Sequence, residues 1–299
     1  MFSPLIYVKP HQKNRCFLLG SMGLCIFLML HDNAIAQHTI LWRVTDTVHQ
    51  KTSYLLGTHH YMGNGFVDSL RPIRKHLLES ELAIFETAET GEQVVAVMNQ
   101  RKADYALKKV LDKASIQQLE FISKEWRVSL YKLQPVELLL KLRAQFYQQV
   151  CGSMQPKDTA DHFDNYLISI ARANQINVFG LETDSLQLNL LQESFAYSWK
   201  DAQSEIKYFL AAFEGRAELG DNCDFVGRYK RFEFDYALDM PCEEDPFIHE
   251  RNQKWMQVLP SLLRSKRCFV AVGLLHLMHN CGLIVELRKV GFVVEPVAL

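Results

Sequence analysis

The chain has 299 residues, of which 48% are hydrophobic and 22% charged, and its formal net charge is −1. These values are typical of a globular protein and exclude the disordered, collagen-like and coiled-coil classes. The near-neutral charge also argues against a nucleic-acid-binding protein, which normally has a basic surface.

The first 36 residues have the pattern of a secretory signal. Lys9, Lys13 and Arg15 precede an apolar run over 16–30, and small residues around Ala36 form a cleavage site. The apolar run is shorter than the roughly 20 residues that a membrane span needs. The sequence therefore predicts cleavage near Ala36. It predicts an exported protein, periplasmic or secreted, that no membrane segment retains after cleavage.

Residues 37–299 are predicted to form one domain in which strands alternate with helices. The expected strands are 38–44, 53–56, 81–85, 176–179, 268–272 and 292–297, the first two joined as a hairpin. The expected helices are 72–78, 164–174, 281–290 and parts of 184–216 and 246–263. The stretch 92–150 is helical in pattern and is interpreted as an insertion. This order predicts an α/β fold with a central, mostly parallel or mixed sheet flanked by helices.

Five cysteines follow the predicted cleavage site: Cys151, Cys223, Cys242, Cys268 and Cys281. In an oxidising compartment they allow one or two disulfides and leave at least one thiol. Cys223–Cys242 is the first pair expected, because both residues lie in a loop-rich acidic stretch. Cys268 begins an apolar strand and is expected to be a buried core residue.

Four of the apolar strands end in polar or glycine-containing segments. These are Gly57-Thr58-His59-His60, Glu86, Gly180-Leu181-Glu182-Thr183 and Gly273-Leu274-Leu275-His276. Parallel strands would bring all four to the carboxyl edge of the sheet, where open α/β sheets bind ligands. A histidine after a strand is most often only hydrogen-bonded, so the prediction depends on the repeated motif. It places two histidines and the carboxylates of Glu86 and Glu182 at one edge, and this combination has the chemistry of a divalent-metal site.

Other candidates have weaker patterns. Glu182 would orient a metal ligand or bind a substrate amine. Arg251 and Asn252 begin a helical stretch, and they are either an exposed helix start or a clamp for a substrate carboxylate or developing oxyanion. His59 would point away from His60 in an extended backbone and is expected to be structural. The sequence has no nucleophilic-serine elbow, P-loop or dinucleotide-binding glycine pattern.

In their order along the chain, these motifs resemble the TraB/GumN family, whose eukaryotic relatives include the TIKI metalloproteases. The resemblance covers nearly the whole chain after residue 36. The matching residues are Gly57-Thr58-His59-His60, Glu86, Asp164, Ala171, Gly180-Leu181-Glu182-Thr183 with Gln187, Arg251-Asn252, Gly273-Leu274-Leu275-His276-Leu277, Gly282-Leu283 and Gly291-Phe292-Val293-Val294.

The resemblance implies metal-dependent peptide cleavage at His60, Glu86 and His276, with manganese or cobalt favoured. Related folds include erythromycin esterase and the haem-binding ChaN protein, so the scaffold also has other functions. His59 replaces a usual aliphatic residue and His279 a common glycine. Both enrich the edge of the site in imidazole, which could change the metal or favour haem.

The sequence thus predicts an exported metal-dependent hydrolase of the peptidase type. It would use manganese, cobalt or zinc and act on a peptide or another small substrate. One alternative is a haem- or metal-binding protein without hydrolytic activity. Another is an inactive interaction module of the same fold that uses its helical insertion. The substrate, the metal and the oligomeric state stay open at this point.

Overall fold

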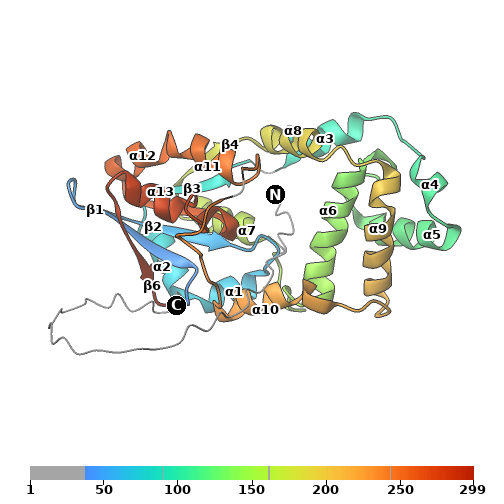
Figure 1. Ribbon diagram of the computed structural model, residues 1–299, viewed down its shortest axis with the longest axis horizontal. Coiled ribbons are helices and arrows are strands. Elements are labelled where there is room, and N and C mark those ends of the chain that lie inside the picture. Colours follow the sequence, from blue (N-terminus) through green and yellow to red (C-terminus); the bar gives the residue numbers. More distant parts are fainter. Residues whose placement is uncertain (1–37, 90, 161, 243) are drawn as a thin grey trace, which may run out of the picture.

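The computed structural model describes residues 38–89, 91–160, 162–242 and 244–299. A six-stranded sheet occupies one half of the molecule, and a group of helices lies beyond one edge of it (Figure 1). Three helices cover one face of the sheet: α11 (His249–Met256), α12 (Leu259–Ser265) and α13 (Leu283–Lys289). Two helices, α2 (Arg71–Leu78) and α7 (Phe163–Ala173), cover the other (Figure 1). This is the α/β architecture that the sequence predicted.

The strands are β1 (Leu41–Asp46), β2 (Lys51–Thr58), β3 (Leu82–Thr87), β4 (Asn177–Glu182), β5 (Cys268–Gly273) and β6 (Val293–Val297), in the order β4-β3-β5-β2-β1-β6. β1 pairs antiparallel with β2, as the predicted hairpin requires, and with β6. The pairs β2–β5, β5–β3 and β3–β4 are parallel. The four strands followed by candidate site residues therefore end on the same edge.

The helices around the sheet are α1 (Asn64–Ser69), α2 (Arg71–Leu78), α7 (Phe163–Ala173), α10 (Asp224–Arg231), α11 (His249–Met256), α12 (Leu259–Ser265) and α13 (Leu283–Lys289). Proline at the first turn of α2 suits a helix start, because the missing N–H has no partner there anyway. The sequence pattern did not predict α1, in which only Val67 is buried. Such a short helix depends on packing rather than on its own periodicity.

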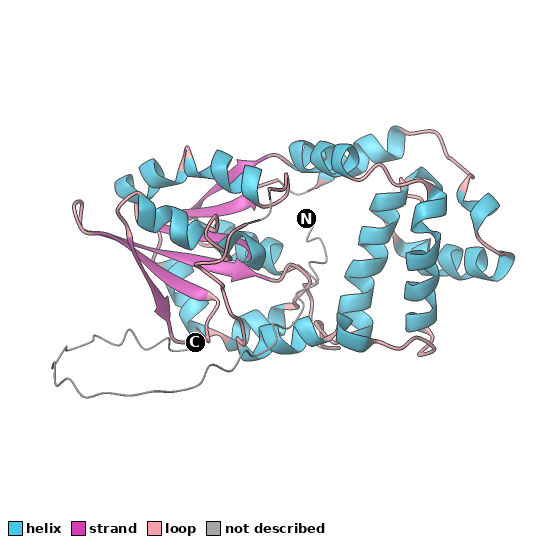
Figure 2. Cartoon of the chain, viewed as in Figure 1, coloured by secondary structure: helices cyan, strands magenta, loops and turns pink. Residues whose placement is uncertain are grey.

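The remaining helices are α3 (Glu92–Gln100), α4 (Leu107–Val110), α5 (Lys113–Ile122), α6 (Pro135–Gln145), the π-helix η3 (Phe146–Val150), α8 (Asp184–Ser194) and α9 (Trp199–Phe213) (Figure 2). Leu138, Leu142 and Phe146 pack with Ile206 and Phe209 of α9 in a second hydrophobic core. The helical part of the molecule thus combines the stretch 92–150 with a helix from much later in the chain.

Two disulfides join segments that are distant in the sequence. Cys151 pairs with Cys223, and Cys242 pairs with Cys281. The expected pair Cys223–Cys242 is therefore wrong. Folding brings the end of η3 beside the start of α10 and the Cys242 loop beside Cys281, and closeness in sequence did not indicate either contact. Cys268 is buried, as predicted, and it is a free thiol.

The predicted signal at 1–36 lies outside the described residues. Within the part of the chain that the structure describes, no helix is both long enough and apolar enough to cross a membrane.

Candidate functional site

The carboxyl edge of the sheet brings His60, Glu86 and His276 together. His60 follows β2, Glu86 is in β3, and His276 is in the short 3₁₀-helix η5 (Leu274–Leu277) that follows β5. The Oε1 atom of Glu86 lies 3.7 Å from Nε2 of His60 and 3.8 Å from Nε2 of His276. A buried carboxylate oxygen therefore lies within 4 Å of two imidazole nitrogens from different strand ends.

Gly273, the last residue of β5, leaves space between these atoms. Its N–H donates a hydrogen bond of 2.7 Å to Oε1 of Glu86. A Cβ atom at this position would lie 3.0 Å from Nε2 of His60 and 3.2 Å from Oε1 of Glu86. A side chain here would press on both facing atoms, so glycine leaves them accessible to each other or to a small ligand between them.

Each histidine is oriented by a partner on its other nitrogen. Nδ1 of His60 lies 2.6 Å from Oδ2 of Asp164, and the Thr58 hydroxyl donates to the other Asp164 oxygen at 2.9 Å. Nδ1 of His276 lies 2.7 Å from Oδ1 of Asn252. The amide of Asn252 in turn donates to the carbonyl oxygens of His276 and Cys281. Nδ1 is thus the donor in both rings, so Nε2 is the nitrogen directed to Glu86.

Arg251 is bonded to the carboxylates of the site. Its Nη2 donates to Oε2 of Glu86 at 2.6 Å and also to Oε1 of Glu182. Its Nη1 lies 3.2 Å from Nε2 of His276. Gln187 completes the group, because its amide donates to Glu182 at 2.8 Å and to Glu86 at 3.3 Å. The guanidinium is 5% exposed and neutralises charge inside the protein.

Burial and these contacts shift the acid–base behaviour of the site. Burial raises the pKa of Glu86, but the charges of Arg251, His276 and His60 outweigh it and hold this pKa well below its usual range. Burial lowers the pKa of His60, whereas the Asp164 carboxylate raises it, and the net direction is upward. Burial and then Arg251 lower the pKa of His276 to about 3. His276 is thus a neutral imidazole, and Glu86 is a carboxylate.

A model of the TraB/PrgY/gumN family matches residues 40–296, nearly the whole folded chain. The chain belongs to the TraB/PrgY/gumN family. No curated protein and no solved structure matches it. In this TraB/PrgY/gumN member, the matched region includes all four strand-end motifs and the residues that contact them.

A second group of potential ligands in this TraB/PrgY/gumN protein shares His60. The ligand atoms of His60, His162 and Asp164 lie within 4.8 Å of one another, and the group could hold a metal ion. Nδ1 of His162 is 3.7 Å from Asp164 and also accepts from the N–H of Asn165 at the start of α7. Motifs at strand ends did not indicate His162, because it caps a helix, and Asp164 entered only through the family pattern.

His59 is buried among aromatic rings, consistent with its expected structural role. Its ring centroid lies 5.2 Å from that of Tyr147, 5.3 Å from Phe225 and 5.5 Å from Tyr229. Burial lowers the pKa of His59 to about 3, so this side chain is neutral. His279 has a positive φ of 64°, and its N–H donates to the carbonyl oxygen of Tyr236.

Proposed function

We propose that this protein is an exported metal-dependent hydrolase of the peptidase class, with His60, Glu86 and His276 as the metal-binding and catalytic residues. The observation that carries the proposal is the arrangement around Gly273. Nε2 of His60 and Oε1 of Glu86 face a space that a carbon atom added at Gly273 would crowd, and Nε2 of His276 lies 3.8 Å from the same Glu86 oxygen. Imidazole nitrogen and carboxylate oxygen are ligands that zinc, manganese and cobalt accept.

The charge balance of the site supports a cation. Three carboxylates, those of Glu86, Asp164 and Glu182, have side chains no more than 5% exposed, and the buried guanidinium of Arg251 contacts two of them. Negative charges therefore exceed positive ones by two when the histidines are neutral. Buried charge that lacks compensation is costly, so either protonation of His60 or a divalent cation would stabilise the site.

The residues around the site have separable tasks in hydrolysis. A divalent cation would lower the pKa of water and polarise the carbonyl group of the substrate. Asp164 and Asn252 hold the two imidazoles in the orientation that directs Nε2 toward Glu86. Glu86 is a carboxylate, so it is able to accept a proton from the attacking water and return it to the leaving amine. Arg251 and Gln187 both donate hydrogen bonds to Oε2 of Glu86 and hold it in place. The same two side chains also donate to Oε1 of Glu182.

Export is part of the proposal. It rests on the signal pattern at 1–36, and the two disulfides support it, because disulfides persist mainly in oxidising compartments.

Metal analysis of protein purified from cells that express the full chain tests the site. We expect close to one manganese, cobalt or zinc ion per chain, and its loss from the double variant His60→Ala/His276→Ala with the circular dichroism spectrum retained. His49→Ala is the matched control, because the His49 side chain is 51% exposed in the first hairpin, and this variant should keep the metal. No bound metal after all three ions are offered would overturn the metal-dependent mechanism.

A peptide library then tests the reaction. We expect cleavage by the metal-loaded protein and none by the double variant or after chelation. Cleavage that continues after chelation would contradict the metal-dependent mechanism and would indicate that His60, paired with Asp164, acts as the general base without a metal. No cleavage of any peptide by metal-loaded protein would overturn the peptidase assignment.

The haem-binding alternative has less support in this geometry. The cavity bordered by His59 and His60 has a volume of about 50 Å³, well below the roughly 300–1,000 Å³ of typical ligand pockets. A Soret band on titration with haemin, lost in His59→Phe, would favour that alternative.

A further inference from the structure

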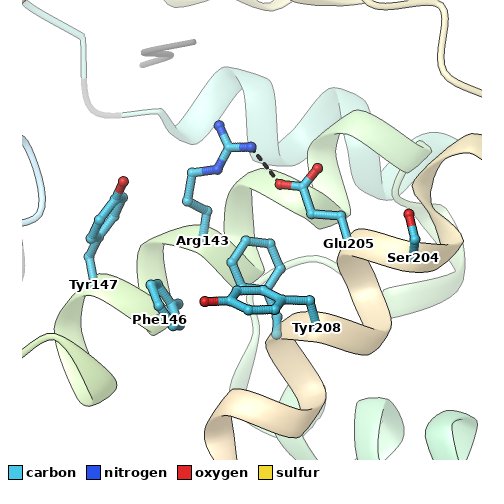
Figure 3. Close-up of a pocket in the computed structure, with 7 residues that line it drawn as sticks. Arg143, Phe146, Tyr147, Ser204, Glu205 and Tyr208 are labelled. Carbon is cyan, nitrogen blue, oxygen red and sulfur yellow. Dashed lines mark hydrogen bonds and ion pairs between the residues drawn. The ribbon is translucent and has the colours of Figure 1, made fainter. Parts of the chain in front are cut away.

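A larger cavity lies in the helical part of the molecule, between α6 with η3 on one side and α9 on the other. It has a volume of about 330 Å³, and four aromatic rings and one ion pair line it: Phe146, Tyr147, Tyr208 and Phe209, with Arg143 and Glu205. We call it the aromatic cavity. Figure 3 shows Arg143 reaching toward Glu205 above the rings, with Ser204 on the α9 side.

The aromatic cavity adjoins the candidate site. The smaller cavity beside His60 is lined by the same two residues, Arg143 and Tyr147. The ring of Tyr147 lies 5.2 Å from the ring of His59 and stacks on that of Tyr61 at 5.8 Å. In Figure 3, Tyr147 and Arg143 stand on one side of the aromatic cavity and Ser204 on the other. A ligand that extends from His60 past these two side chains would therefore enter the aromatic cavity.

The π-helix η3 explains how one segment serves both cavities. The N–H of Cys151 donates to the carbonyl oxygen of Phe146 at 3.1 Å, five residues earlier. Phe146 packs against Phe209 of α9 at 5.5 Å, while the next residue, Tyr147, contacts His59 near the sheet. The disulfide from Cys151 to Cys223 anchors the end of this turn. Single π-helical turns occur frequently at functional sites.

The chemistry of the walls selects an uncharged aromatic group. Aromatic rings pack favourably edge to face or offset against another ring. The Arg143–Glu205 pair joins α6 to α9 at 2.5 Å, with side chains 17% and 34% exposed. Because the two charges balance each other, the cavity favours neither an acidic nor a basic side chain. Its volume falls at the lower end of the range for ligand pockets, which suits one side chain rather than a large cofactor.

We propose that the aromatic cavity is the subsite that binds an aromatic side chain of a peptide substrate whose scissile bond lies beside His60. This inference rests on the proposed peptidase function for its substrate class. The cavity determines which peptide is bound, and the residues at the sheet edge act on the bond.

Binding of two small probes tests the cavity without any reaction. N-acetyl-phenylalanine amide should bind at least tenfold more tightly than N-acetyl-alanine amide, as measured by calorimetry or NMR titration. Ser204→Trp places a ring in the cavity from an exposed position and should remove this difference. Lys207→Trp adds the same ring to α9 at a residue that does not line the cavity, so it should keep the difference. Tyr208→Ala removes a wall instead of filling the space and should weaken the preference several-fold.

Cleavage assays separate failure of the subsite from failure of the peptidase. For matched peptides with phenylalanine or alanine near the bond, we expect kcat/KM to differ by about 10- to 100-fold. Ser204→Trp should abolish the difference while the metal content stays unchanged. Cleavage without aromatic preference, or a preference that survives Ser204→Trp, would overturn the subsite but leave the hydrolase intact. Selective binding of the phenylalanine probe with no cleavage of any peptide would support the subsite and count against the peptidase.

Discussion

At the edge of the sheet, Arg251 is buried and bonded to the buried carboxylates of Glu86 and Glu182, with the Arg251 side chain 5% and the Glu86 side chain 2% exposed. Between α6 and α9, the pair Arg143–Glu205 is partly open to solvent. The charges at the sheet edge are held in place by contacts with one another, because water does not reach these buried groups. The Arg143–Glu205 pair is weaker, because solvent screens it. This difference suits reacting groups that must stay in place and a recognition surface that tolerates variation.

The largest decrease in the free energy of unfolding is expected from Arg251→Met. The substitution leaves Glu86 and Glu182 buried side by side without their shared cation. Breaking a buried pair in this way costs about 3–5 kcal/mol, which urea unfolding of metal-free protein would measure. The double variant Arg251→Met/Glu182→Gln should recover part of the loss, because one of the two buried charges is then absent. A loss below about 1 kcal/mol for the single variant would contradict the assigned role of Arg251.

Gly273→Ala should abolish metal binding at a smaller cost in stability. The added methyl group would lie 3.0 Å from Nε2 of His60, and overpacking of this kind costs about 1–3 kcal/mol. Gly227→Ala in α10 is the control, since the nearest atom to its added methyl group is the flexible end of the Arg231 side chain, 3.1 Å away, and this variant should keep the metal. Metal content and thermal unfolding of both variants measure the effect. A Gly273→Ala protein with undiminished metal would place the ion elsewhere, for instance at the His162 group.

The pH dependence of stability should reveal the buried neutral histidines. The pKa of His59 is about 3 in the folded protein and about 6.5 in the unfolded chain. Between these values the unfolded chain binds more protons, so stability falls as the pH decreases from about 6.5 toward 3. The slope is about 1.4 kcal/mol per pH unit for one such group.

His59→Phe removes this contribution and keeps an aromatic ring in place. Unfolding free energies at pH 6.5 and pH 5 should therefore differ less in His59→Phe than in the unmodified protein. His276 retains its own contribution in both proteins. Equal slopes would mean that folding does not lower the pKa of His59.

Glu205→Gln should cause the smallest decrease in the free energy of unfolding. The pair with Arg143 is partly exposed, and such pairs contribute less than about 1 kcal/mol. Urea unfolding beside Arg251→Met gives the comparison directly. A loss as large as that of Arg251→Met would remove the distinction between the two regions.

The sequence predicted the parts of the fold that local patterns specify. The apolar strands, the first hairpin and the helices over 72–78 and 164–174 follow from alternation and periodicity over a few residues. Because β2, β3, β4 and β5 are parallel, their ends meet, and His60, Glu86 and His276 lie together. The strand-end motifs therefore predicted that these residues share one edge of the sheet, and the structure confirms this placement.

Other features depend on segments that no local pattern connects. The disulfide partner of Cys223 is Cys151, 72 residues earlier, rather than the nearer Cys242. α9 packs on the helices of 92–150 through its apolar face. The sequence of α9 indicates that this face is buried, but it does not indicate which helices cover it. Arg143 and Tyr147 likewise line two cavities only because folding places α9 on one side of them and the sheet edge on the other.

The sequence by itself determined which residue types follow each strand, and with them a cluster of two histidines and carboxylates at one edge. Only the tertiary structure decided the partner of each side chain. Asp164 is 104 residues from His60, and Arg251 is 165 residues from Glu86. Strand and helix formation depend on neighbours within a few residues, whereas these contacts arise when buried polar groups find partners as distant elements pack together.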